Sequence, residues 1–165
     1  MHTALMSGTY DPITMGHLDV IKRTAQIFDA LIIGVAESPK KGGGPLFRME
    51  ERVAFVEDAV SPIGNVSVLA FSKLLVDFAV EVGAQTIVKG LRAVTDFESE
   101  FQQASLNYRL NPDLETMFIM ATPEHMYLSS SVVREVASLG GDVHIWVTPL
   151  VERALIKRFS LQQKQ

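Results

Sequence analysis

The stretch GTYDPITMGH, residues 8–17, combines residue types that suit contact with an anion near the start of the chain. Gly8 lets a ligand approach the backbone closely, because glycine has no side chain. His17 ends the stretch and falls near the start of the first expected helix, where the helix dipole favours negative charge. The stretch therefore predicts that His17 contacts an anionic group.

Further cations and hydroxyls follow other apolar runs of the chain. Lys41, Lys89 and Arg92 can bind phosphate oxygens. Ser129, Ser130 and Ser131 precede a helical pattern, so their hydroxyls and the first backbone N–H groups of that helix would form an anion pocket. In a chain with a net charge of −4, this local set predicts a polyanionic ligand, most simply one that carries phosphates.

Each feature also has a simpler explanation. His17 could be an ordinary histidine at a helix end, the serines an N-cap, and residues 37–45 (ESPKKGGGP) a solvated loop. Ser38 and Lys41 match the SxxK pattern of serine hydrolases, but its companion motifs are missing from the sequence. The sequence has no Walker loop and no GxGxxG, HExxH or GxSxG motif, and its four histidines lack metal-ligand spacing. A functional site is favoured only because all of these residues are expected at one edge of the same sheet.

The elements that would position these residues can be read from the hydrophobic pattern. Five short apolar runs are typical of buried parallel strands: Thr3–Met6, Ala30–Ala36, Val66–Ala70, Thr86–Lys89 and Thr116–Ala121. They alternate with helical patterns at residues 18–28, 48–60, 73–82 and 96–110. Two more helices are expected, one from the serine run to Gly140–Gly141 and one starting at Thr148–Pro149. Thr95 followed by Glu98 predicts a capping box for the fourth helix.

This alternation predicts an α/β fold with a doubly wound, five-stranded parallel sheet of order 3-2-1-4-5, followed by C-terminal helices, as one domain over residues 1–165. Ligands of such sheets bind past the carboxyl ends of the strands, where the strand order reverses. The loops that carry the cations and the serines all lie at that edge of the sheet. Asp96 and Glu98 would be first-turn acids, and Glu100, deeper in the helix, could face the crevice.

The composition indicates where the protein works and which partners it binds. No apolar run approaches the roughly 18 residues of a membrane span, and the N-terminus lacks the pattern of a secretory signal. The chain has no cysteine, which fits a cytoplasmic protein. The acidic net charge argues against nucleic acid as a partner. We therefore expect a cytoplasmic protein that binds neither membranes nor nucleic acid.

Three segments, SGTYDPITMGH, VKGLRAVTDFESE and YLSSSVVREV, resemble in order and spacing the bacterial phosphopantetheine adenylyltransferase family. The first contains the TxGH element of nucleotidyltransferases with a Rossmann-like sheet, and the other two are more specific. The resemblance covers nearly the whole chain. It implies that ATP and 4′-phosphopantetheine give dephospho-coenzyme A and pyrophosphate, with Mg²⁺ carried on the substrate phosphates, in a homohexamer.

The resemblance also implies roles for individual residues. His17, Lys41 and Arg92 would be catalytic, with His17 stabilising the transition state at the α-phosphate. The residues implied at the ATP site are Thr9, Tyr10, His17, Gly90, Leu91, Arg92, Glu100, His125, Met126, Tyr127, Leu128, Ser129, Ser130 and Ser131. Those implied for phosphopantetheine are Thr9, Lys41, Leu75 and Lys89.

Three positions depart from the usual family pattern. Lys89 stands where arginine is frequent, which keeps the charge but loses the bidentate fork. Ser7 stands in place of a proline, and His125 in place of a tryptophan near the adenine. The change at Lys89 bears on substrate affinity, and the changes at Ser7 and His125 bear on the details of the adenine site.

Two alternatives stay open from the sequence. The chain could be another adenylyl- or cytidylyltransferase acting on nicotinate mononucleotide or on a sugar or glycerol phosphate, or a nucleotide-binding regulatory module without catalysis. No nucleophilic side chain is suitably placed, so direct in-line attack is expected for a transferase. The apolar residues around Phe97, Phe101 and Met117 exceed what one small domain needs and favour an oligomer.

Overall fold

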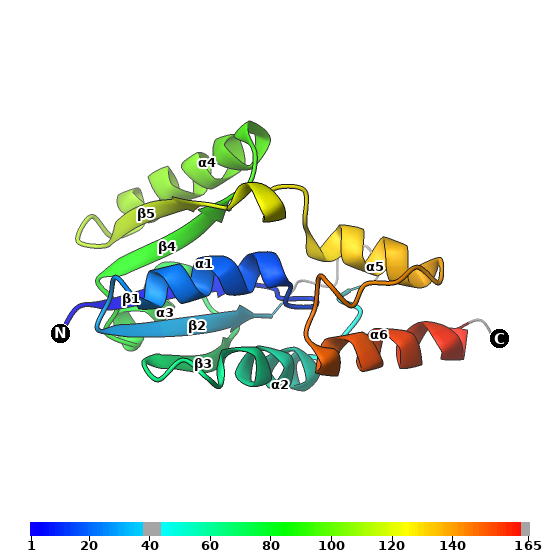
Figure 1. Cartoon of the computed structure of the whole chain (residues 1–165). Helices are drawn as coiled ribbons and strands as arrows, with labels where there is room; N and C mark the ends of the chain where they lie inside the picture. The colour runs from blue at the N-terminus through cyan, green and yellow to red at the C-terminus, as the bar shows by residue number, and fades with distance from the viewer. Residues whose placement is uncertain (38–43, 163–165) are drawn as a thin grey trace.

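Five parallel strands form one sheet in the order β3-β2-β1-β4-β5 in the computed structural model, which describes residues 1–37 and 44–162 (Figure 1). The strands are β1 (Thr3–Gly8), β2 (Ala30–Ala36), β3 (Val66–Phe71), β4 (Thr86–Leu91) and β5 (Glu115–Met120). At the centre, Met6 of β1 pairs with Ile33 of β2 and with Val88 of β4. The predicted strand order is confirmed. The hydrogen-bonded ladders of β1, β3 and β4 continue one or two residues beyond the predicted ends, and β5 is shifted by one residue.

Helices connect successive strands, and two more follow β5. They are α1 (Met15–Ala25), α2 (Met49–Val60), α3 (Leu75–Glu81), α4 (Val94–Leu110), α5 (Ser130–Ser138) and α6 (Pro149–Gln162), with a short 3-10 helix η2 (Pro123–His125) before α5. Figure 1 shows α5 and α6 beyond the carboxyl ends of the strands. Within the described part of the chain, every helix is too short or too polar to cross a membrane.

Helices α1, α5 and α6 begin at side-chain caps. The Oγ1 atom of Thr14 accepts from the His17 N–H at 3.4 Å, so α1 begins three residues earlier than predicted. It also ends three residues earlier, at Ala25. The Oγ atom of Ser129 accepts from the Val132 N–H at 3.2 Å, which confirms the predicted N-cap of α5. Thr148 does the same at the start of α6, as predicted from Thr148–Pro149.

The predicted capping box of α4 is wrong. This helix begins at Val94 after Ala93, which makes no side-chain cap, so Thr95 and Glu98 lie inside its first turns. The carboxylate of Asp96 instead accepts from the backbone N–H of Arg92 at 3.3 Å. Asp96 therefore fastens the chain just before α4 to the first turn of the helix, and the free N–H groups of that turn have no side-chain cap among the described residues.

Two clusters of buried apolar side chains lie on opposite faces of the sheet. The larger one packs the sheet against α1, α2, α5 and α6, and the smaller one packs it against α3. Alternate residues of β1 enter different clusters: Ala4 and Met6 belong to the larger and Leu5 to the smaller. β1 and β2 are therefore buried on both faces, as their apolar sequences predict.

The two outer strands are less buried than predicted. Residues of β3 and β5 are mostly exposed or half-buried, whereas the middle of β2 is fully buried. On β5, 40% of Met117 and 66% of Met120 remain exposed. An edge strand has a neighbour on one side only, so an apolar sequence does not ensure burial within one chain.

Candidate functional site

A cavity of about 360 Å³ lies at the carboxyl ends of β1 and β4, where the strand order reverses. Its walls come from the β1–α1 loop, the start of α1, the end of β4, the first turns of α4 and the segment that leads into α5. The predicted site residues that line it are Tyr10, His17, Lys89, Gly90, Arg92, Glu100, His125, Leu128, Ser129, Ser130 and Ser131. The topology thus brings together residues from five segments of the chain.

The remaining predicted residues lie elsewhere. Thr9 lines an adjoining hollow of about 370 Å³, which it shares with His17, Ser131 and Arg134. Leu91, Met126 and Tyr127 line neither space, and Leu75, at the start of α3, packs against the smaller apolar cluster. Lys41 lies outside the described residues.

His17 is oriented by the N-terminus of α1. Its Nδ1 atom accepts a hydrogen bond from the Thr14 N–H at 3.1 Å and lies 3.0 Å from Thr14 Oγ1. Because Nδ1 accepts, the proton of the neutral imidazole resides on Nε2. The Tyr10 ring packs edge-on against the His17 ring, with 5.2 Å between their centroids. These contacts leave Nε2–H available as a donor to a ligand.

The surroundings keep His17 uncharged at neutral pH. Burial lowers the pKa of His17 from its ordinary value of 6.5 to about 4, and the positive charge of Arg92 acts in the same direction. A histidine with this pKa neither donates a proton as an acid nor adds a full charge near pH 7. What such a histidine can offer a ligand near pH 7 is a hydrogen bond from Nε2.

Lys89 and Arg92 both line the cavity, but only Lys89 is held loosely, whereas Arg92 makes a bidentate pair. The Lys89 ammonium is 3.7 Å from the Glu100 carboxylate and 3.4 Å from Ser7 Oγ, both longer than a strong ionic hydrogen bond. The Arg92 guanidinium pairs with the carboxylate of Asp96 at 3.0 Å. It also donates to the Leu128 carbonyl at 2.9 Å. Incoming phosphates could replace these partners without unfolding any element.

Two buried polar atoms on α4 have no hydrogen-bond partner among the described residues: Glu100 Oε2 and Asn107 Nδ2. Buried polar groups are normally paired. Residues seven positions apart lie on the same side of a helix, so both atoms belong to one side of α4. Glu100 lines the cavity, whereas Asn107 does not.

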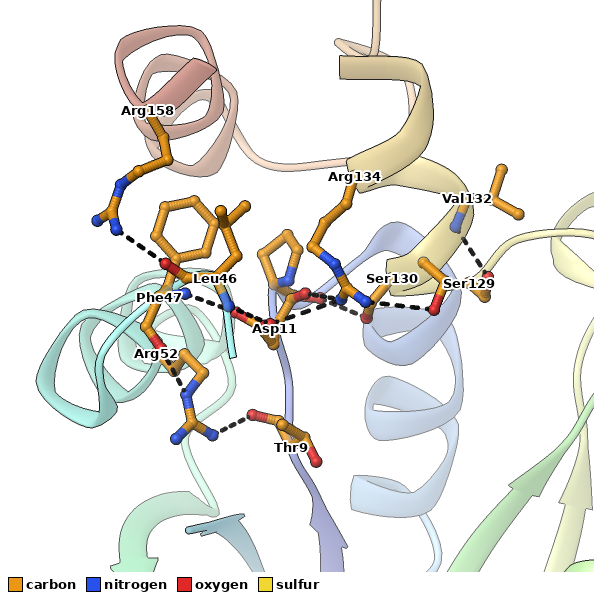
Figure 2. A network of polar contacts seen from close by, with 12 residues as sticks. Thr9, Asp11, Leu46, Phe47, Arg52, Ser129, Ser130, Val132, Arg134 and Arg158 are labelled. Atoms are coloured by element: carbon orange, nitrogen blue, oxygen red, sulfur yellow. Dashed lines mark hydrogen bonds and ion pairs between the residues drawn. The ribbon is translucent and has the colours of Figure 1, made fainter. Parts of the chain in front are cut away.

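The serine run joins α5 to the β1–α1 loop (Figure 2). The hydroxyl of Ser130 donates to the Pro12 carbonyl at 2.8 Å, and Ser131 Oγ accepts from Arg134 Nη2 at 3.3 Å. Since Ser129 to Ser131 all line the cavity, the N-terminus of α5 faces the space where a ligand would lie. Its free backbone N–H groups suit a phosphate.

Asp11 lines the adjoining hollow, and sequence reasoning missed it (Figure 2). Its buried carboxylate accepts from the backbone N–H groups of Leu46 at 2.8 Å and Phe47 at 2.9 Å, and lies 3.6 Å from the Arg134 guanidinium. Arg134 also donates to the Asp11 carbonyl. The motif GTYDPITMGH contains Asp11, but its partners are distant in sequence, so only the fold reveals them.

No group of three or more His, Asp or Glu side chains in the described ranges 1–37 and 44–162 is arranged to hold a metal ion. The donors around the cavity are instead cations, hydroxyls and N–H groups. Such a set fits phosphate oxygens rather than a bare cation.

Comparison with known proteins agrees with this geometry. A family model described as cytidylyltransferase-like matches residues 5–136. The phosphopantetheine adenylyltransferase of Moorella thermoacetica is 51% identical over 159 residues, which cover 96% of this chain and 98% of that protein. The protein of the same name from Hahella chejuensis is 48% identical over 163 residues, covering 99% of this chain and 100% of that protein.

A solved structure shares the fold at low sequence similarity. A Vibrio parahaemolyticus protein assigned as a nicotinate-nucleotide adenylyltransferase superposes with a TM-score of 0.67 at 19% identity, over 94% of this chain and 99% of that one. At this identity the likeness concerns the fold alone. Sequence identity near one half over full-length relatives is the stronger finding: the chain belongs to the phosphopantetheine adenylyltransferase family, within the cytidylyltransferase-like proteins.

Proposed function

We propose that this chain transfers the adenylyl group of ATP to 4′-phosphopantetheine, giving dephospho-coenzyme A and pyrophosphate, the penultimate step of coenzyme A biosynthesis. The observation that carries the proposal is the convergence of His17, Lys89 and Arg92 on one cavity at the switch point of the sheet, in a chain about half identical to enzymes of that name. Residues 1–165 would act as one nucleotidyltransferase domain in the cytoplasm.

The reaction requires charge stabilisation more than proton transfer. An oxygen of the phosphopantetheine phosphate forms a bond to the α-phosphorus of ATP, and the bond from that phosphorus to the oxygen of the β-phosphate breaks. The attacking oxygen is already anionic, so no general base is needed. A neutral His17 that donates from Nε2 fits this chemistry, because a preorganised donor stabilises charge on the α-phosphate oxygens. Attack is then direct, without a covalent enzyme intermediate.

The substrates would occupy different walls of the cavity. ATP would lie along Gly90 and Arg92 of the β4–α4 segment, with its phosphates toward the serine N-terminus of α5. The acceptor phosphate would be bound by Lys89 and Lys41, and its pantetheine arm would run toward Leu75. The phosphates of ATP would carry Mg²⁺, which neutralises their charge.

The exposed apolar surface supports an oligomer. On α4, 42% of Phe97 and 57% of Phe101 are exposed, and Met117 on β5 is 40% exposed. The rings of Phe97 and Phe101 adjoin one another, with centroids 5.6 Å apart, so these two rings form one patch. Such a patch is typical of protein contact surfaces. We propose a homohexamer, and light scattering that shows a stable monomer of 18.2 kDa at micromolar concentration would contradict it.

Pyrophosphate release from ATP with each candidate acceptor tests the activity. We expect release with 4′-phosphopantetheine and none measurable with nicotinate mononucleotide or glycerol 3-phosphate. Release with another acceptor in place of phosphopantetheine would assign the chain to a different transferase. ATP binding without release for any acceptor would favour a regulatory module.

Calorimetry of Lys89→Ala tests the acceptor assignment. We expect phosphopantetheine binding to weaken by about 1.5–3 kcal/mol, the contribution of a charged hydrogen bond, while ATP binding changes less. Lys41→Ala should behave in the same way. Lys73→Ala is a matched control, because Lys73 is paired with Glu81 on the surface and does not line the cavity. Equal losses for both ligands in Lys89→Ala would place this lysine at the nucleotide.

A further inference from the structure

Arg52 of α2 is a buried cation whose hydrogen bonds within the described residues all go to backbone carbonyls. Its side chain is 1% exposed, and no ion pair between described residues includes it. Nε donates to the Phe47 carbonyl at 3.1 Å, and Nη1 donates to the carbonyls of Thr9 at 2.6 Å and Ala36 at 2.9 Å. An apolar side chain would fill this space without the cost of burying a charge. What the guanidinium adds is a rigid fork of donors that joins three segments.

One of these segments is the loop that precedes α1 (Figure 2). The Thr9 carbonyl belongs to the planar peptide group that joins Thr9 to Tyr10, so the hydrogen bond from Arg52 sets the orientation of that peptide. Tyr10 has a φ of 48°, a left-handed conformation that is rare for a bulky residue and must be imposed by its surroundings. Arg52 supplies one such constraint.

The same peptide leads to the catalytic histidine. The Tyr10 side chain is 4% exposed, and its ring packs edge-on against that of His17 at 5.2 Å. A rotation of the Thr9–Tyr10 peptide would therefore move the ring that supports His17. A shift of about 1 Å in a catalytic group can lower a rate by about 100-fold.

We propose that Arg52 is a positioning residue, which holds the Thr9–Tyr10 peptide so that Tyr10 supports His17 in its productive orientation. The inference rests on the proposed function, since it acts through the role of His17 there. It makes a distinct claim: the effect of Arg52 on turnover should depend on His17.

The test is a double-mutant cycle on kcat for pyrophosphate release. Arg52→Lys keeps the charge but cannot reach the three carbonyls with one fork. We expect kcat to fall about 10-fold in the wild-type background and less than about twofold in the His17→Asn background, because coupled residues are non-additive. Rates are divided by the concentration of ATP-binding sites from calorimetry, so that partial unfolding does not lower them. The Kd for ATP should change less than about threefold.

Arg158→Lys is the matched control. Arg158 donates to the Leu46 carbonyl at 2.8 Å and pairs with Glu51 at 2.7 Å, so it tethers the segment next to Phe47 without touching the β1–α1 loop. Its kcat should stay within about twofold of wild type. Arg52→Met, assayed below its unfolding temperature, is the second variant.

Three outcomes would overturn the inference: an unchanged kcat per site in both Arg52 variants, the same fold-loss with and without His17, or loss of ATP binding by both variants. Each would leave Arg52 as a purely structural residue. Inactive wild-type enzyme with phosphopantetheine would instead remove the proposed function.

Discussion

Arg52 and Arg92 show two uses of the same type of side chain in one molecule. Arg52 is buried and donates to three carbonyls, whereas the side chain of Arg92 is 39% exposed and pairs with Asp96. The first arrangement cannot change without leaving buried carbonyls unpaired, which costs free energy. The second exchanges one anion for another at little cost. The buried contacts of Arg52 and Asp11 therefore form a rigid frame that holds the β1–α1 loop. The Arg92–Asp96 pair is a part of the cavity wall at which a ligand can replace the carboxylate.

The two aspartates that pair with arginines repeat this contrast. The Asp11 side chain is 7% exposed and accepts two backbone N–H bonds, while that of Asp96 is 28% exposed. Variants in the frame should lower stability, and those of Arg52 should also lower turnover through His17. Variants in the cavity wall should lower binding or turnover with little loss of stability. The predictions below test this division.

His17→Asn should give the largest effect on turnover. The asparagine amide can accept from the Thr14 N–H as Nδ1 does, so α1 keeps its cap, but the Nε2–H donor is lost. We expect kcat to fall by about 10²–10³, with ATP binding little changed. Steady-state kinetics and calorimetry measure both quantities. Retention of more than about a tenth of the wild-type kcat would contradict the catalytic role of His17.

Asp11→Asn and Asp96→Asn make the same chemical change in the two regions. Asp11→Asn turns one acceptor oxygen toward Leu46 and Phe47 into a donor, so we expect a loss of about 1–3 kcal/mol in the free energy of unfolding. Asp96→Asn should change it by less than about 1 kcal/mol, because the pair is partly exposed. Urea denaturation measures both. Similar losses of unfolding free energy in both variants would contradict the distinction between the frame and the cavity wall.

The pH dependence of stability tests the environment of His17. Its pKa is about 4 in the folded chain and near 6.5 when unfolded, so between these values the unfolded state binds more protons. The stability of the wild type should therefore fall relative to His17→Asn as the pH drops from 6.5 to 4. Urea midpoints of both proteins across this window measure the difference. A constant difference would show that His17 titrates normally.

Gly16→Ala should have the smallest effect. A Cβ atom there would lie 3.5 Å from the Cβ of His125 and from Thr14 Oγ1, ordinary contacts that the fold tolerates. Gly16 also lines the cavity, so the new methyl group would take space from the nucleotide. We expect a loss of about 1 kcal/mol in ATP binding, about fivefold in Kd. Gly64→Ala, where a Cβ would meet nothing within 4 Å, is the control.

Local sequence was sufficient for the order of the elements and most of the cavity lining. Alternating apolar runs and helical patterns determine a parallel sheet, and the topology then collects the loops of His17, Lys89, Arg92 and the serine run at one edge. This worked because each loop is attached directly to the end of its own strand or helix. The start of α4 could not be predicted in this way, since Thr95 is as good a local cap as Ser129.

Only the tertiary structure shows which contacts hold the site residues in place. Apart from the Phe47 carbonyl, which is five residues from Arg52, the backbone partners of Arg52 and Asp11 are 16 to 43 residues away in sequence. A backbone carbonyl or N–H carries no sequence signature. The protonation of His17 also depends on the fold, because burial and Arg92 set its pKa. The exposure of Phe101 and Met120 has the same origin: their apolar character is visible in the sequence, but only the packing shows that α4 and β5 leave them uncovered. Residue types determine which groups are available for chemistry, and the packed chain determines their partners, their charge and their access to water.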